Sequence, residues 1–203
     1  MSRTRTGTIG PARERGSKSA VPFAPPARGA EALATAAVCV ALGVVLPFFI
    51  HPFGWSPRVI LPMHFPVFLG GMLLGPIHAA MVGILAPALS MGLTGMPTAA
   101  QVLRMMPELA VYGLMTSIML HALPTVKGLP PRIGRIAAMV LAMLVAMIAG
   151  RVTYIAVSVV VTGIREIDYY AMVLIIPAIP GMIAQLVIVP PLAYKLHRLI
   201  LKS

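Results

Sequence analysis

Six apolar segments dominate this sequence and restrict its possible folds more than any other feature. A helix needs about 20 apolar residues to cross the hydrocarbon core of a bilayer. Of the 203 residues, 59% are hydrophobic, and the mean hydropathy is +0.93, which no water-exposed globular surface could carry. The sequence therefore predicts an all-α membrane protein, a bundle of six transmembrane helices. The segments cover approximately residues 31–50, 61–74, 76–93, 100–121, 133–161 and 169–197.

The second segment is too short to cross a bilayer unaided. A helix over residues 61–74 would be about 21 Å long. We expect it to be packed among its neighbours or extended by ordered non-helical chain. It begins with Pro62, His64 and Pro66, which a simple lipid anchor does not need.

The basic residues indicate the orientation of the helices. Lysine and arginine number 16 against five acidic residues. They gather before the first segment, near the start of the fifth and near the end of the sixth. With six crossings these three groups share one side, which the positive-inside rule assigns to the cytoplasm. We therefore predict a multi-pass protein of the plasma membrane with both termini in the cytoplasm.

The chain divides into a tail and one membrane domain. Residues 1–29 are rich in Pro, Gly, Ser and Arg, without apolar periodicity, and predict a disordered basic cytoplasmic tail. Residues 30–203 predict the six-helix domain. Beside so apolar a domain, the tail favours anionic lipid and the bilayer as partners, with no nucleic acid.

Two charged residues lie deep inside predicted helices, where each charge is costly. Glu108 and Arg151 lie at similar depths, about 12 and about 16 Å from the outer ends of their helices. Tyr112 and Tyr154 follow them by four and three residues and share their helical faces. Paired charges beside phenols suit a small polar ligand. A structural ion pair that locks two helices is equally open, and interfacial tyrosines are an alternative for Tyr154.

Two further polar side chains need an explanation. His64 opens the second segment from the outer side and could contact a ligand, or it could bond to backbone groups freed by Pro62 and Pro66. Gln185 lies about 25 Å from the outer start of the sixth segment if that helix begins near residue 169. At that depth we expect it to make a hydrogen bond between helices.

Motifs of catalysis and metal binding are missing from the sequence. It has no HExxH, no GxSxG with triad partners, no phosphate-binding loop and no Cys/His cluster at metal spacing, and its single cysteine is Cys39. We therefore predict no enzyme activity, no cofactor and no metal site. Active transport would need separate energising subunits, because no ATPase domain is visible.

Small residues recur at four-residue spacing in the first segment. The pairs Ala32/Ala36 and Ala37/Ala41 permit close approach of another helix. That helix could belong to this chain or to another membrane subunit.

Several stretches resemble one protein family. They are the alanine-rich first segment, LPMHFPVFLGGMLLGPIHAAMVGILAPALSMGLTGMP, PELAVYG, AGRVTYIAV and IPGMIAQLVIVP. Over about residues 30–201 the chain resembles the substrate-binding S components of energy-coupling factor (ECF) transporters. Such proteins capture vitamins or related micronutrients at the outer face and dock on a transmembrane coupling subunit driven by two ATPases.

The resemblance implies roles for particular residues. Residues 54–64 would form a lid over the ligand, and the alanines of the first helix would meet the coupling subunit. Met63 and His64 are internal, whereas metal-transporting relatives use Met-His at a free N-terminus, so cobalt or nickel transport is disfavoured. A small transmembrane scaffold of the cell-elongation type, which binds protein partners and no solute, is the alternative. The implied pocket residues are His64, Glu108, Tyr112, Arg151 and Tyr154, and the implied docking residues are Ala32, Ala36, Ala37 and Ala41.

Overall fold

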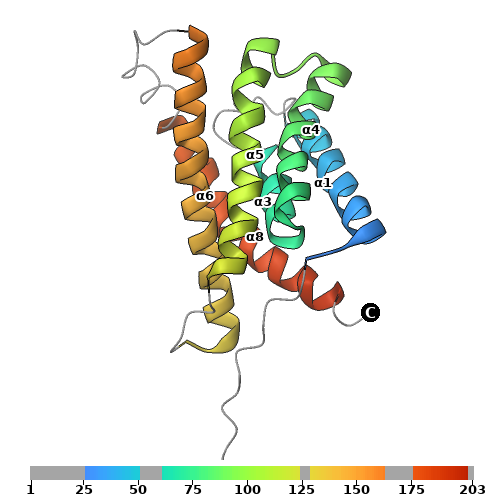
Figure 1. Ribbon diagram of the computed structural model, residues 1–203, viewed down its shortest axis with the longest axis vertical. Helices are drawn as coiled ribbons and strands as arrows, with labels where there is room; N and C mark the ends of the chain where they lie inside the picture. Colours follow the sequence, from blue (N-terminus) through green and yellow to red (C-terminus); the bar gives the residue numbers. More distant parts are fainter. Residues whose placement is uncertain (1–25, 51–60, 124–128, 163–175, 201–203) are drawn as a thin grey trace, which may run out of the picture.

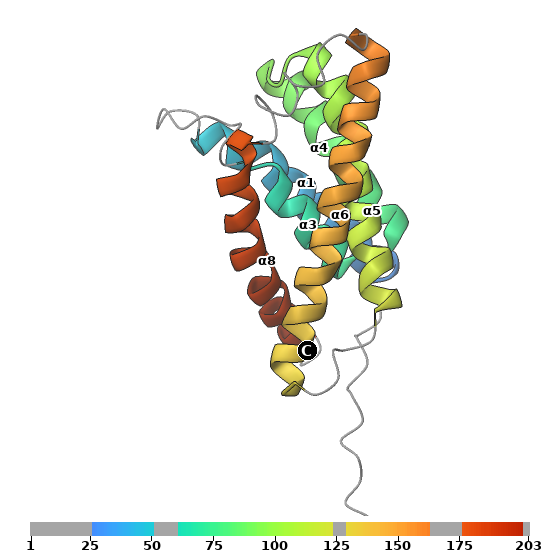
Figure 2. The ribbon, with the colours of Figure 1, turned by 90° about the vertical axis from the view of Figure 1, so that its left-hand side faces the viewer.

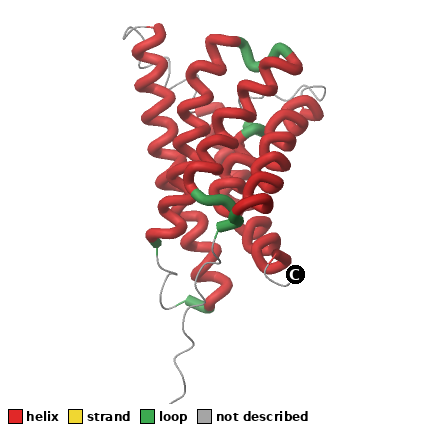
Figure 3. Tube along the Cα trace, turned by 45° about the vertical axis from the view of Figure 1, so that its right-hand side comes forward, coloured by secondary structure: helices red, strands yellow, loops and turns green. Residues whose placement is uncertain are grey.

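The computed structural model describes residues 26–50, 61–123, 129–162 and 176–200, and this part of the chain is helical with short connections (Figures 1 and 3). It contains six α-helices, one short 3-10 helix and no strand among these residues, so the all-α prediction is confirmed. The elements are α1 (Gly29–Ile50), α3 (His64–Leu73), α4 (Pro76–Thr94), α5 (Ala99–Ala122), α6 (Pro131–Thr162), η3 (Ile176–Ala178) and α8 (Ile179–Ile200).

The predicted segments agree closely with these helices, except at the start of the sixth. That segment was expected from residue 169, whereas α8 begins at Ile179 after η3, and residues 163–175 lie outside the described part. Most of the predicted tail and lid also lies outside it. Within the described ranges, four helical stretches are long and apolar enough to cross a membrane: Gly29–Phe49, Pro76–Thr94, Pro131–Val161 and Ile176–Leu199.

Successive helices run in opposite directions through the bundle (Figures 1 and 2). Arg132 at the start of α6 lies over the ring of Tyr194 near the end of α8, 5.9 Å from its centroid. The backbone N–H of Ala27, just before α1, donates to the carbonyl of Leu73 at the end of α3, at 3.3 Å. The starts of α1, α4 and α6 therefore share one end of the bundle with the ends of α3, α5 and α8. We call this the basic end, because it holds Arg28, Arg132, Arg135, Lys195 and Arg198.

The short helix α3 lies inside the bundle, with nearly every residue buried (Figure 1). Its C-terminal carbonyl groups would be costly there without partners. The hydroxyl of Ser117 on α5 donates to the carbonyl of Leu74 at 2.8 Å, and the backbone N–H of Ala27 donates to the carbonyl of Leu73. A ten-residue helix is therefore tolerated because its neighbours complete its hydrogen bonds.

Small residues bring α4 and α5 into backbone contact. A Cβ at Gly83 would overlap the carbonyl group of Leu109, and a Cβ at Gly113 would overlap that of Ala79. Such close approach lets helices pack tightly where lipid supplies no hydrophobic driving force between them. It also fixes the position of α5, which carries Glu108.

Candidate functional site

A buried ion pair connects α5 and α6. Arg151 Nη1 lies 3.0 Å from Glu108 Oε1, and the Tyr112 hydroxyl donates to the same oxygen at 2.7 Å. Glu108 and Tyr112 are each 1% exposed. Sequence reasoning placed these three residues together, and the structure brings them together. A charge-assisted bond and a phenol on one carboxylate oxygen hold the guanidinium in a fixed place.

His64 is the first residue of α3 and extends this group. Its ring centroid lies 5.4 Å from that of Tyr112, whose other neighbour is Phe68 at 5.0 Å. His64 is 3% exposed, and neither ring nitrogen has a hydrogen-bond partner among the described residues. Bonding to freed backbone, the alternative expected from Pro62 and Pro66, is therefore not seen in this part of the chain. Pro66 instead occupies the first turn of α3, where its missing N–H costs no helical bond.

Gln185 also belongs to this region, although the sequence analysis did not include it among the pocket residues. Its Nε2 donates to the carbonyl of Leu61 at 3.3 Å, and the backbone N–H of His64 donates to the same oxygen at 3.0 Å. Leu61 adopts φ +51°, an uncommon value for a residue other than glycine. Gln185 lies only six residues after Ile179, about 9 Å along α8, so the predicted depth of about 25 Å was wrong.

These contacts define the polar cluster: His64, Glu108, Tyr112, Arg151 and Gln185. Its residues come from α3, α5, α6 and α8. They lie away from the basic end, toward the opposite end of the bundle, at which α3, α5 and α8 begin. Burying polar atoms without hydrogen bonds is costly, so each such atom needs an explanation, and a bound ligand or ordered water is one. The buried atoms without a partner among the described residues include both His64 ring nitrogens, Arg151 Nε and Nη2, and Gln185 Oε1.

Tyr154 follows Arg151 on α6 and is 8% exposed, so its side chain is inside the described bundle. This burial differs from that of a typical interfacial tyrosine. Among the described residues no group of three His, Cys, Asp or Glu side chains could hold a metal ion.

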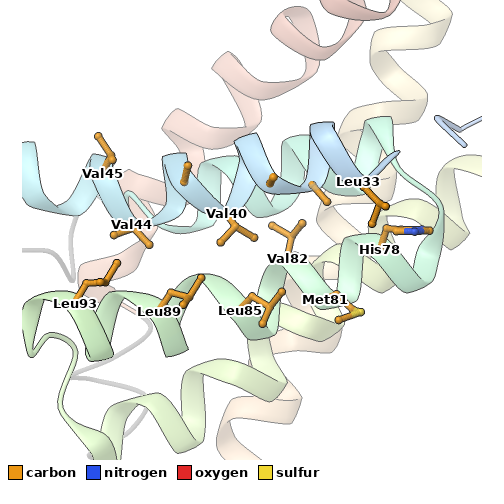
Figure 4. Close-up of a pocket in the computed structure, with 13 residues that line it drawn as sticks. Leu33, Val40, Val44, Val45, His78, Met81, Val82, Leu85, Leu89 and Leu93 are labelled. Carbon is orange, nitrogen blue, oxygen red and sulfur yellow. The ribbon is translucent and has the colours of Figure 1, made fainter. Parts of the chain in front are cut away.

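The alanines of α1 separate into two environments. Ala32 is fully buried in the core, so it is not available on an exposed face. Ala36, Ala37 and Ala41 line a groove between α1 and α4 with a volume of about 590 Å³. Figure 4 shows apolar side chains from both helices along it, among them Val40 on α1 and Leu85 on α4.

The fold and the polar cluster define a class of protein: a multi-pass helical membrane protein with polar groups from four helices meeting inside an apolar bundle. The family model described as "ECF transporter, substrate-specific component" matches residues 31–193. The chain therefore belongs to the family of ECF transporter substrate-specific components, as its resemblance predicted, and members of this family are transporter subunits. No curated protein and no solved structure matches it.

Proposed function

We propose that this protein is the solute-capture subunit of an ECF-type ABC importer, binding a vitamin or related small micronutrient in the polar cluster. The observation that carries the proposal is the set of buried polar atoms without partners in the cluster. An apolar bundle gains nothing from such atoms unless a ligand or ordered water satisfies them. Membership of the substrate-specific family supports this interpretation.

The proposed sidedness places the cluster where a solute would arrive. We place the protein in the plasma membrane. The positive-inside rule then orients its basic end toward the cytoplasm. The polar cluster then lies in the outer half of the bundle, because the starts of α3, α5 and α8 face away from the basic end. Both termini would be cytoplasmic.

The proposed energising partner is a transmembrane coupling subunit driven by two ATPases. The α1–α4 groove supports docking of the coupling subunit against α1, since Ala36, Ala37 and Ala41 leave room for a partner helix to approach closely. A cell-elongation scaffold, the alternative function, would not need unpartnered polar atoms buried inside its bundle.

Native mass spectrometry of the gently purified protein tests the proposal. We expect a co-purifying small molecule with the wild type, and its loss in Arg151→Met. The matched control is Arg132→Met, the same substitution at the basic end. A wild type that carries no small molecule, and that is not stabilised by the small-molecule fraction of a rich growth medium, would contradict solute capture.

A further inference from the structure

We infer that the polar cluster selects a net anionic solute, that Arg151 binds the carboxylate of this solute, and that Arg104 is a second, unassigned cation of the site. The inference rests on the proposed function and specifies its substrate class. Three observations carry it: the unused donors of Arg151, the position of Arg104, and the charge balance of this half of the bundle.

One complete hydrogen-bonding edge of the Arg151 guanidinium has no partner among the described residues. Glu108 engages only Nη1, and Tyr112 donates to the same carboxylate oxygen. The Nε and Nη2 atoms are buried and have no partner among the described residues. These two donors form one side of the planar guanidinium, and their spacing matches the two oxygens of a carboxylate. A single carbonyl oxygen would fit this pair of donors less well.

Arg104 lies on the same face of α5 as Glu108, one turn nearer the start of the helix. Its Nε donates to the carbonyl of Ala100 at 3.0 Å, so the side chain follows its own helix, and it is half-buried. The side chain therefore points toward the start of α5, one turn beyond the cluster, where a cation would attract an anionic solute as it approaches.

The described charges near the cluster do not balance. Arg104 and Arg151 carry two positive charges against the single carboxylate of Glu108, which leaves one positive charge unmatched. Residues 51–60 and 163–175, which the structure does not describe, contain two arginines and two acidic residues and so add no net charge to the sequence. The positive end of the α3 dipole, at His64, adds to the excess. The unmatched charge is that of half-buried Arg104, because Arg151 and Glu108 pair with each other. An anionic ligand would neutralise this charge, whereas a neutral ligand would leave it.

A fractionation experiment tests the sign of the ligand charge. The probe is the small-molecule fraction of a rich growth medium, separated at neutral pH on an anion exchanger. The readout is the thermal unfolding of the full-length wild-type protein in detergent at low ionic strength. We expect the retained, anionic material to stabilise the protein, and esterification with acidic methanol to abolish this effect, with aqueous acid of equal strength as the control treatment.

Variants then test the two arginines, using the dilution of the retained fraction that gives half-maximal stabilisation. Arg151→Met should weaken binding by about 30-fold or more, the loss typical of removing one partner from a buried charge pair. Arg104→Gln should weaken it by about fivefold, less so as salt is added, while Arg104→Lys should retain most of the affinity. Arg132→Gln, at the basic end, is the matched control and should bind as the wild type does.

The outcomes separate this inference from the proposed function. The anionic assignment is overturned if only neutral or cationic material stabilises the protein, or if the stabilising effect survives esterification. Either result is still consistent with solute capture. Wild-type affinity in Arg104→Gln at low salt overturns the role of Arg104. If no fraction stabilises the wild type, solute capture itself fails.

Discussion

The ring of Tyr112 on α5 lies directly against the backbone of Gly150 on α6. A Cβ at position 150 would overlap the ring carbons Cδ1 and Cε1 and lie 2.9 Å from Cζ. Gly150 immediately precedes Arg151, so the same close approach that accommodates the phenol brings the guanidinium to Glu108. Glycine at this position therefore sets the geometry of the ion pair.

Gly150→Ala should disturb the polar cluster without changing any of its polar groups. The added methyl group must displace Tyr112 or α6, and overpacking of this kind costs about 1–3 kcal/mol. We expect a lower unfolding temperature and weaker solute binding. Gly92→Ala is the control, because a Cβ at Gly92 on α4 would meet nothing within 4 Å. It should be neutral or stabilise by up to about 1 kcal/mol. Equal behaviour of the two variants would contradict the role of Gly150.

The ion pair should contribute to stability and to binding, and the two effects can be separated. Removing one partner of a buried pair costs about 3–5 kcal/mol, so Arg151→Met and Glu108→Gln should each destabilise the protein. Replacing both residues with well-packed apolar side chains should restore most of that stability but not solute binding. Thermal unfolding and ligand affinity, measured on the same preparations, distinguish these effects. A stable double variant with native affinity would reduce the pair to a structural lock.

Helix positions and the ion pair could be predicted from the sequence because both depend on simple distances along the chain. Apolar length predicted the helices to within a few residues except at the start of the sixth, and similar depth brought Glu108 and Arg151 together. Both arguments need only the rise per residue of a helix.

The remaining errors have physical causes. Depth arguments failed for Gln185, because the helix start was counted from residue 169 and α8 begins at Ile179. Four-residue spacing could not show that Ala32 is fully buried, whereas Ala36 is only partly buried and also lines the groove. The contact of Gly150 with Tyr112 depends on how two helices pack, which no local pattern records. Arg104 had a local signal, its position four residues before Glu108, that could have been used.

Gln185→Leu should weaken solute binding more than it weakens the fold. The substitution removes the donor to Leu61 but leaves the His64 N–H bond to that carbonyl, so we expect a stability loss of only about 1 kcal/mol. The turn that starts α3 loses one of its two restraints, and His64 is held less firmly. Ligand affinity and unfolding temperature are the measurements. Unchanged affinity in Gln185→Leu would exclude this glutamine from the site.

The basic end should face the cytoplasm. Reporter domains fused after Ser203 and inserted at residues 162–168 should report opposite sides of the membrane, because one additional crossing separates them in a six-span topology. Activity of both reporters on the same side would overturn the proposed orientation and the placement of the polar cluster in the outer half.

Blocking the α1–α4 groove should stop uptake while leaving solute binding intact. Ala36→Trp and Ala41→Trp place a large ring where a partner helix would need to approach closely, and neither residue belongs to the polar cluster. We expect both variants to bind solute with near-native affinity, to lose co-purification with the coupling subunit and to abolish uptake in cells. Val38→Trp is the matched control, since Val38 is 59% exposed on the same helix and does not line the groove. Normal uptake in both groove variants, or equal loss in Val38→Trp, would show that coupling uses another surface.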